Sequence, residues 1–281
     1  MRRQVVAVLN RRRRAKIDKR RNQPPGMELI LDAGNTRVKA GLFREGRLVR
    51  VIALAPDDLE GLRGFVGDAD VLEVVIGSVA SSEGAVLAGA AEFAPVHSIT
   101  GASASPVRSS YRTPSTLGVD RLANAVAAAA FFPGRAALAI DLGTCITYDL
   151  VDPQGNYLGG AISPGMRMRA KAMHAYSARL PLVEPAMESI PFGDSTESAL
   201  QSGLYHGIAG EVERFMHLAR SSFTDACVVL TGGDALGFAR GLKSGIFAHP
   251  FLTLEGLRLI HRHLHAGTGP PGAGLGTGAA G

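Results

Sequence analysis

The order of hydrophobic and polar positions predicts a strand, a polar turn and a hairpin near residue 30. The apolar run 28–31 leads directly into Asp32-Ala-Gly-Asn-Thr. Two further apolar runs, 38–43 and 47–54, flank Arg44-Glu45-Gly46, and a short Gly-containing loop between such runs is typical of a β-hairpin. The pattern then predicts helices over 57–65, about 83–93 and 117–132, strands over 71–77 and 96–99, and a loop over 101–116.

The same order returns in the second half of the chain. An apolar strand over 136–140 leads into Asp141-Leu-Gly-Thr, and the runs 146–151 and 157–162 flank Asp152-Pro-Gln-Gly-Asn, a second hairpin signal. Further helices are predicted over 164–178, 195–220 and 254–265, with a strand over 227–230 that leads into Thr231-Gly-Gly.

This repeat defines the expected fold. Asp32 and Asp141 occupy matched positions, each after a strand and before a hairpin. Alternating strands and helices indicate α/β layers, and duplication indicates two lobes with a cleft between them. We therefore predict an N-terminal lobe over residues 27–132 and a C-terminal lobe over 133–265.

Composition fits a globular protein and excludes several classes. The 281 residues are 46% hydrophobic and 20% charged, which is too apolar for a disordered chain. No apolar run approaches the ~20 residues of a transmembrane helix. Two cysteines without a CxxC motif exclude a disulfide scaffold and a cysteine zinc site, and indicate the reducing cytoplasm.

The net charge of +5 comes from the first 26 residues, which hold ten Arg or Lys and one acid. The remainder is mildly acidic and has no basic stripe for nucleic acid. Residues 1–26 are either a basic, disordered arm for nucleic acid or anionic lipid, or an upstream extension of a protein that begins at Met27. A targeting peptide is the weaker interpretation: the segment is Arg-rich and poor in acids, but it has no Ser, and its apolar run 5–9 is too short for a signal sequence. Residues 266–281, rich in Gly and Pro, are predicted to be a flexible tail.

Three histidines precede this tail, at positions 261, 263 and 265. On a helix, residues two apart point to different faces. The spacing therefore does not favour a metal site formed by all three.

The two D-x-G turns have the residue types of a polyphosphate site. Gly34 removes the Cβ that would obstruct a phosphate, Asn35 and Thr36 add short polar donors, and Lys39 adds a positive charge. Asp141-Leu-Gly-Thr144 repeats this arrangement. Mg²⁺ commonly takes one or two carboxylates together with phosphate oxygens. One D-x-G turn is an ordinary strand end, but two copies at equivalent positions favour a nucleotide site.

Longer motifs refine this interpretation. The layout resembles the superfamily of sugar kinases, acetate kinase, actin and Hsp70 chaperones, in which ATP lies between two ribonuclease-H-like lobes. Within it, the chain is similar to the type III pantothenate kinase family from Met27 to about His265. The motifs that carry this resemblance are Tyr111-Arg-Thr-Pro-Ser-Thr-Leu-Gly-Val-Asp-Arg121, Asp141-Leu-Gly-Thr-Cys-Ile-Thr and Tyr157-Leu-Gly-Gly-Ala-Ile-Ser-Pro-Gly165.

The resemblance implies phosphorylation of pantothenate by ATP, the first step of coenzyme A synthesis, in a homodimer that requires Mg²⁺ and a monovalent cation, K⁺ or NH₄⁺. It implies that Asp120 is the catalytic base, that Asp141 holds the monovalent cation, and that Asp32 is a candidate ligand for Mg²⁺. The residues implied for ATP are Asp32, Ala33, Gly34, Asn35, Thr36, Arg37, Val38, Lys39 and Thr144. Those implied for pantothenate are Tyr111, Gly118, Val119, Asp120, Arg121 and, from the neighbouring subunit, Thr196.

Other interpretations of these residues stay open from the sequence. Asp120 also suits the first turn of a helix, and Cys145 is typical of a small buried side chain. The alternative functions are a kinase for another substrate, or a non-catalytic regulatory protein whose basic head contacts nucleic acid. For the dimer contact, the apolar segment 204–208 is a candidate.

Overall fold

The computed structural model describes residues 26–34, 36–78, 84–242 and 245–266. Almost all of the predicted basic head (1–26) and Gly-rich tail (266–281), together with Asn35, lie outside the described residues. Within the described part, no helix combines the length and apolarity that a bilayer crossing needs.

The first sheet has the strand order β3-β2-β1-β4-β5. Strands β1 and β2 are antiparallel, as are β2 and β3, whereas β4 and β5 run parallel to β1. The tight turn between β2 and β3 forms because Glu45 and Gly46 both adopt positive φ, of 50° and 74°, the backbone that two-residue hairpin loops require. The strands are β1 (Met27–Ala33), β2 (Val38–Arg44), β3 (Arg47–Leu54), β4 (Val71–Ser78) and β5 (Val96–Ile99).

The second sheet repeats this topology. Its order is β11-β10-β7-β8-β9-β6, in which β7, β8 and β9 form an antiparallel meander and β10 and β11 run parallel to β7. Apart from β6, each strand has a counterpart in the first sheet. The strands are β6 (Arg108–Ser109), β7 (Ala137–Leu142), β8 (Cys145–Val151), β9 (Asn156–Pro164), β10 (Cys227–Thr231) and β11 (Ile246–Ala248). The predicted duplication is thus confirmed at the level of strand order.

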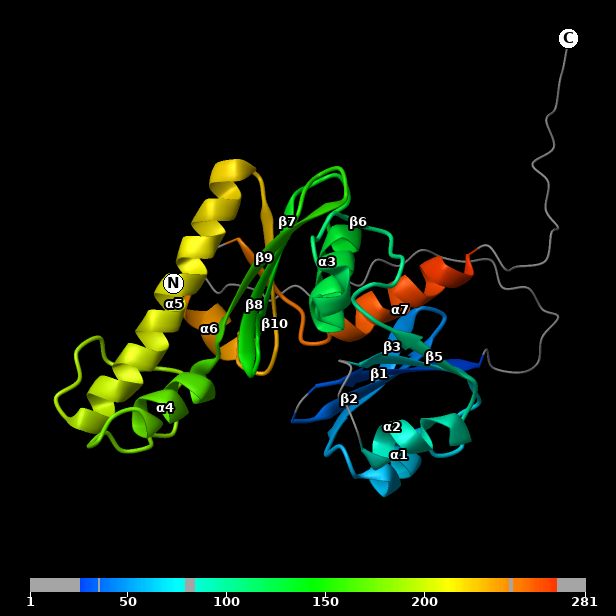
Figure 1. Cartoon of the computed structure of the whole chain (residues 1–281), viewed down its shortest axis with the longest axis horizontal. Helices are drawn as coiled ribbons and strands as arrows, with labels where there is room; N and C mark the ends of the chain where they lie inside the picture. The colour runs from blue at the N-terminus through cyan, green and yellow to red at the C-terminus, as the bar shows by residue number, and fades with distance from the viewer. Residues whose placement is uncertain (1–25, 35, 79–83, 243–244, 267–281) are drawn as a thin grey trace, which may run out of the picture.

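Helices cover both sheets (Figure 1). The longest, α5, begins with a capping box in which Ser195 and Ser198 exchange side-chain and backbone hydrogen bonds. The helices are α1 (Leu59–Val66), α2 (Ala85–Gly89), α3 (Val119–Phe131), α4 (Met166–Ala175), α5 (Thr196–Ser222), α6 (Ala235–Gly241) and α7 (Leu252–His265). Two 3₁₀ turns are η1 (Ala90–Glu92) and η2 (Pro114–Thr116).

The last helix, α7, packs between α3 and the first sheet (Figure 1). The two helices approach so closely that a Cβ on Gly256 would lie 1.9 Å from the carbonyl oxygen of Ala123. On the sheet side, a Cβ on Gly77 of β4 would lie 2.5 Å from Leu257. Leu254, Leu257 and Ile260 share one core with residues of β1, β2 and β4. The last helix, α7, therefore completes the hydrophobic core on one face of the first sheet.

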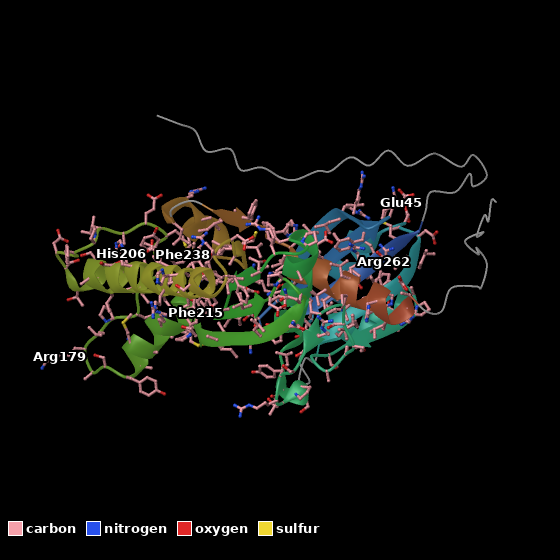
Figure 2. The ribbon with its side chains drawn as sticks, turned by 90° about the horizontal axis from the view of Figure 1, so that it is seen from above. Glu45, Arg179, His206, Phe215, Phe238 and Arg262 are labelled. Atoms are coloured by element: carbon pink, nitrogen blue, oxygen red, sulfur yellow. The ribbon has the colours of Figure 1, made fainter. Side chains whose placement is uncertain are left out.

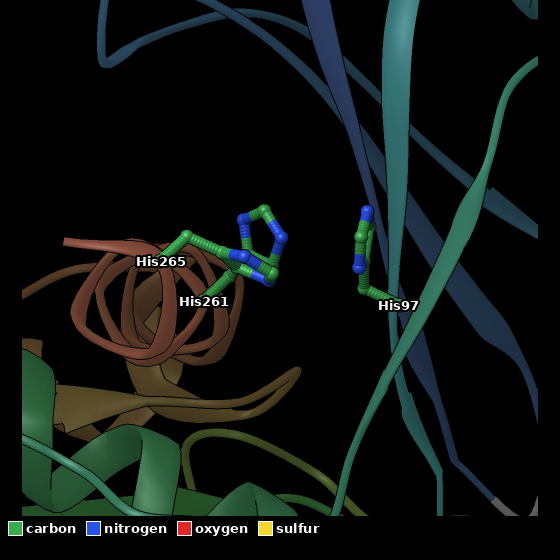
Figure 3. Close-up of side chains that lie close together, drawn as sticks. All are labelled: His97, His261 and His265. Atoms are coloured by element: carbon green, nitrogen blue, oxygen red, sulfur yellow. The ribbon is translucent and has the colours of Figure 1, made fainter. Parts of the chain in front are cut away.

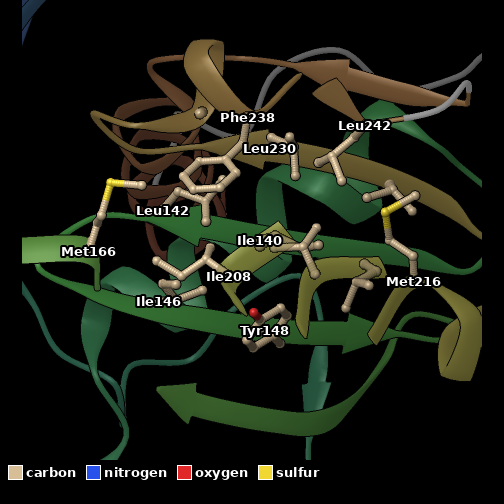
Figure 4. Packing of buried hydrophobic residues seen from close by; sticks show 14 of the residues in the cluster. Ile140, Leu142, Ile146, Tyr148, Met166, Ile208, Met216, Leu230, Phe238 and Leu242 are labelled. Atoms are coloured by element: carbon tan, nitrogen blue, oxygen red, sulfur yellow. The ribbon is translucent and has the colours of Figure 1, made fainter. Parts of the chain in front are cut away.

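The second sheet has its own core, formed with α5 and α6 (Figure 4). Tyr148 and Phe215 stack there with ring centroids 4.0 Å apart, and Phe238 closes the cluster from α6. Leu204 and Ile208 also belong to it, each 1% exposed. The expectation that segment 204–208 forms a dimer contact is therefore wrong, because these side chains face inward from α5.

Candidate active site

Asp32 and Asp141 lie at equivalent positions of the two sheets. Asp32 pairs with Lys39 across β1 and β2, and Asp141 pairs with Thr147 across β7 and β8. Each is the penultimate residue of its strand and is half-buried. Both carboxyl groups therefore emerge where the chain turns between strands.

Asp141 and Asp120 both act on the carboxyl group of Asp32. Burial, together with these two neighbouring acids, raises the pKa of Asp32 to about 7, although Lys39 lowers it. Burial also raises the pKa of Asp141, with Lys39 again opposing and Asp120 adding to the rise. The two lobes thus bring three acidic side chains into one electrostatic environment, where Lys39 is the basic side chain that opposes their repulsion.

A chain of hydrogen bonds orients Asp141. The amide Nδ2 of Asn124, on α3, donates to Asp141 Oδ2 at 3.3 Å. Thr253 Oγ1, near the start of α7, donates to Asn124 Oδ1 at 3.0 Å. On the other side lies Gly232, which has φ of +93° and approaches so closely that a Cβ would lie 2.4 Å from Asp141 Oδ1. Gly232, the first glycine of the Thr231-Gly-Gly turn after β10 (Cys227–Thr231), therefore packs against Asp141.

In the first D-x-G turn, some residues are exposed to solvent and others have buried side chains. Gly34, Thr36 and Arg37 are exposed, and Gly34 N–H donates to the carbonyl oxygen of Arg37 at 3.1 Å. Ala33 and Val38 have buried side chains. These two residues can therefore contact a ligand through backbone atoms alone.

In the second turn, Thr144 and Cys145 are exposed. The interpretation of Cys145 as a buried filler is wrong, because β8 begins at this residue and its first side chain points outward. Cys227, on β10, is the buried cysteine.

Asp120 lies in the first turn of α3, where backbone N–H groups favour an acid. Its Oδ1 accepts the backbone N–H of Arg121 at 2.9 Å. A Cβ on Gly118 would lie 2.4 Å from the same oxygen. Gly118 thus leaves room for this carboxylate, while Val119 turns its side chain into the core.

Arg121 is buried in an ion pair that sequence reasoning missed. Its Nε donates to Asp149 Oδ1 at 2.9 Å, and the two side chains are 5% and 0% exposed. Tyr157 Oη donates to the same oxygen at 2.7 Å, and Arg121 Nη1 donates to Tyr111 Oη at 3.4 Å. Burial raises the pKa of Asp149 while the Arg121 guanidinium opposes this rise. The only sequence signal for this role of Asp149 was its position as an acidic residue within the otherwise apolar run 146–151.

An open pocket of about 550 Å³ lies beside this ion pair. Tyr111 and Tyr157 line it and connect it to Arg121 and Asp149 through the hydrogen bonds above. The remaining lining residues come from the segment after β6 and from β9: Ser110, Arg112, Thr113, Leu158, Gly159 and Gly160.

Thr196 is not brought to these residues within one chain. It is the exposed first residue of α5, which begins at the outer end of the second lobe (Figure 1). The segment between α4 and α5, marked by Arg179 in Figure 2, lies at the same end, away from the first sheet.

The donor set at the two turns fits the cations that the resemblance implies. Carboxylate oxygens are the ligands that Mg²⁺ prefers, and they also suit a monovalent cation. Asp141 and Asp120 raise the pKa of Asp32, and Asp120 raises the pKa of Asp141; a bound cation would relieve this repulsion.

The raised pKa of Asp32 leads to a pH-dependent prediction. A carboxyl whose folded-state pKa is raised contributes stability that is complete below the unfolded value, 3.8, and is lost as pH rises through about 7. Asp32→Asn stays neutral at every pH. Without nucleotide or metal, it should melt about 5 °C above the wild type at pH 8 and within 1 °C of it near pH 4. Scanning calorimetry from pH 4 to 8 tests this, and a pH-independent offset would contradict it.

These features can be compared with known proteins. Residues 28–218 match the family described as type III pantothenate kinase. A type III pantothenate kinase of Bacteroides fragilis is 40% identical over 235 residues, 83% of this chain and 97% of that protein. One from Flavobacterium johnsoniae is 38% identical over 242 residues, 84% of this chain and 98% of that protein. A crystal structure from Campylobacter jejuni, of a protein assigned to the Baf family of transcriptional activators, has a TM-score of 0.54 at 18% identity, with 85% of this chain and 99% of that chain covered.

The duplicated sheets define an α/β protein with two ribonuclease-H-like lobes, the actin-like ATPase fold. Within this class, the chain belongs to the type III pantothenate kinase family. The relatives are named as kinases, which does not favour the non-catalytic alternative. The likeness to the Campylobacter protein concerns the fold alone.

Proposed function

We propose that this protein transfers the γ-phosphoryl group of ATP to the primary hydroxyl of pantothenate, giving 4′-phosphopantothenate, the first step of coenzyme A synthesis. Family membership supports this activity. The observation that carries the proposal is the shared electrostatic environment of Asp32 and Asp141, from equivalent turns, with Asp120. Phosphoryl transfer depends mainly on positioning and charge neutralisation, which such an arrangement supplies.

Each part of the site has a proposed role. The backbone of residues 32–39, with Lys39 and Thr144, binds the phosphates of ATP. Asp120 accepts the proton of the attacking hydroxyl. Asp32 holds Mg²⁺ and Asp141 holds a monovalent cation, and these ions neutralise phosphate charge when bound.

The pocket beside Tyr111 and Tyr157 is the proposed pantothenate site. Its volume of about 550 Å³ is within the range of small-molecule sites, roughly 300–1,000 Å³. The ion pair with Asp149 holds Arg121 against Tyr111, with the guanidinium 5.7 Å from the ring centroid. Arg121 therefore fixes the pocket wall by holding Tyr111, while Gly118 and Val119 set the position of Asp120.

The test is ATP consumption by the purified full chain with Mg²⁺, in the presence and absence of pantothenate. We expect ADP release to require pantothenate and the product to be phosphorylated at its primary hydroxyl. The 4′-deoxy analogue, which lacks this hydroxyl, should give no turnover. Turnover with glucose or N-acetylmannosamine but not with pantothenate would instead support another kinase of this class.

The proposed cation at Asp141 predicts a salt dependence. Replacing K⁺ or NH₄⁺ with Na⁺ should lower the turnover number at saturating ATP, because a smaller, more strongly hydrated ion fits the site less well. Initial rates at constant ionic strength measure this. Equal rates in all three salts would contradict the assignment.

A homodimer with a shared active site would bring Thr196 from a neighbouring subunit. The segment between α4 and Thr196 carries exposed apolar side chains. Tyr176 and Phe192 are 93% and 92% exposed, and Leu182 and Ile190 are also exposed. Clustered apolar residues on a surface mark interaction sites. We propose that this segment forms the dimer contact.

Two free cysteines support the expected cytoplasmic location.

Light scattering tests the dimer. The wild type should have twice the chain mass of 29.3 kDa, and Phe192→Ser should shift the equilibrium toward monomer and lower pantothenate turnover. Val49→Ser, at an exposed apolar position of β3, is the matched control and should leave the mass unchanged. A monomeric, active wild type would contradict the proposal.

A further inference from the structure

A histidine cluster (His97, His261 and His265) joins α7 to the first sheet at a distance from the proposed active site. His261 and His265 are one helical turn apart on α7, and His97 lies on β5. Figure 3 shows the rings of the two helical residues directed toward His97. The ring centroids are 4.7 Å apart for His97 and His261, 4.9 Å for His97 and His265, and 4.4 Å for His261 and His265.

We propose that His97, His261 and His265, together with Glu73, bind one divalent transition-metal ion, of which Zn²⁺ fits best.

The spacing of the donor atoms suits such an ion. One ring nitrogen from each histidine lies within 4.8 Å of the other two. A tetrahedral ion with Zn–N bonds of about 2.0–2.1 Å holds its nitrogens roughly 3.4 Å apart. His265 is exposed, so a change of rotamer can close the remaining distance.

One ring nitrogen of the buried member, Nε2 of His261, lacks a hydrogen-bond partner among the described residues. The side chain of His261 is 4% exposed. A buried polar atom in this state costs free energy unless a ligand satisfies it.

Glu73, on β4, supplies the fourth ligand. Its Oε2 is 3.5 Å from His261 Nε2 and 3.9 Å from His97 Nε2. These distances exceed a good hydrogen bond but allow one ion to lie between the groups. Glu28 lies beside Glu73 and His261 and is hydrogen-bonded to Glu73, which holds the Glu73 carboxylate next to the cluster.

The ligand set selects the metal. Three imidazoles and one carboxylate are typical zinc ligands, and four protein ligands close the coordination sphere. Mg²⁺ prefers oxygen ligands and retains water, so it does not compete well for this set. A closed site without an open coordination position points to a structural role: it ties the end of α7 to the first sheet.

The sequence did not reveal this cluster, because the spacing of positions 261, 263 and 265 does not favour a site formed by all three and His97 is distant in the chain. His261 and His265, four residues apart, share one face of α7. His263 is exposed and does not belong to the cluster. The third imidazole comes from β5, more than 160 residues earlier, and no local spacing reveals it.

The experiment uses the untagged full chain, freed of metal by a chelator and titrated with ZnCl₂ against a chromophoric zinc indicator. We expect one equivalent to bind with Kd at or below about 1 μM. At a hundredfold excess over Kd, the melting temperature should rise by about 5–10 °C. Co²⁺ in place of Zn²⁺ should give the intense visible absorption of a tetrahedral complex. Absence of saturable binding would overturn the proposal.

Three variants distinguish this site from general binding by surface histidines. His97→Ala and His265→Ala should each weaken Zn²⁺ affinity at least 100-fold and remove the Co²⁺ spectrum. His263→Ala, on the same helix but outside the cluster, is the matched control and should bind like the wild type. Equal affinity in the wild type and His265→Ala, or an equal loss in His263→Ala, would refute the assignment. Far-ultraviolet circular dichroism and pantothenate-dependent turnover, both expected to be retained, show that the variants fold.

Discussion

We expect Asp120→Asn to lower kcat by about 10²–10⁴-fold, or roughly 2.7–5.5 kcal/mol of barrier. In the proposed reaction Asp120 accepts the proton of the attacking hydroxyl, and an amide cannot do so. The variant should fold normally, because asparagine can accept the same hydrogen bond from the backbone N–H of Arg121. The KM for ATP should change little, since the phosphates are bound by the two turns.

Steady-state kinetics with pantothenate and ATP varied independently measure this effect. Asp68→Asn is the control, since Asp68 is an exposed acid in the turn before β4, and it should keep the wild-type kcat. A folded Asp120→Asn variant with near-normal turnover would remove Asp120 from the role of base.

The second large effect is expected at Asp149, on stability. Asp149→Ala should lower the free energy of unfolding by about 3–5 kcal/mol, because it leaves the buried Arg121 guanidinium without its counter-charge. Tyr157 Oη would also lose its acceptor. Pantothenate turnover should fall as well, since the same contacts hold the wall of the proposed substrate pocket.

Urea unfolding at pH 7 tests this prediction against two milder variants. Tyr157→Phe removes one hydrogen bond and should cost about 1 kcal/mol. Asp149→Asn keeps an acceptor but loses the charge, and should fall between the other two. If Asp149→Ala unfolds within 1 kcal/mol of the wild type, the ion pair does not contribute as proposed.

Local signals explain what could be predicted from the sequence. The hairpins around Gly46 and Gly155 were predictable because positive-φ glycines lie between apolar runs of strand length. Duplication then predicted the matched positions of Asp32 and Asp141. The helix α3 was placed within two residues of its bounds, since Gly118 precedes an Ala-rich, mainly apolar stretch.

Features that depend on distant contacts could not be predicted in this way. The short elements β6, β11 and α6 have too few residues for a periodic pattern. The partner of Arg121 is 28 residues away, on a strand whose alternation does not show which acid faces a cation. Cys145 and segment 204–208 were misjudged because hydrophobicity alone does not say which way a side chain faces.

The position of α7 has a consequence for how the protein is made. Translation reaches this helix after every strand of both sheets, yet the helix covers the apolar face of β1 and β4, and its Thr253 supports Asn124 and thereby Asp141. A nascent chain stalled before residue 252 would therefore leave Ile30 and Val75 open to chaperones. We expect nucleotide binding to begin only once α7 has been synthesised and has packed against α3 and the first sheet.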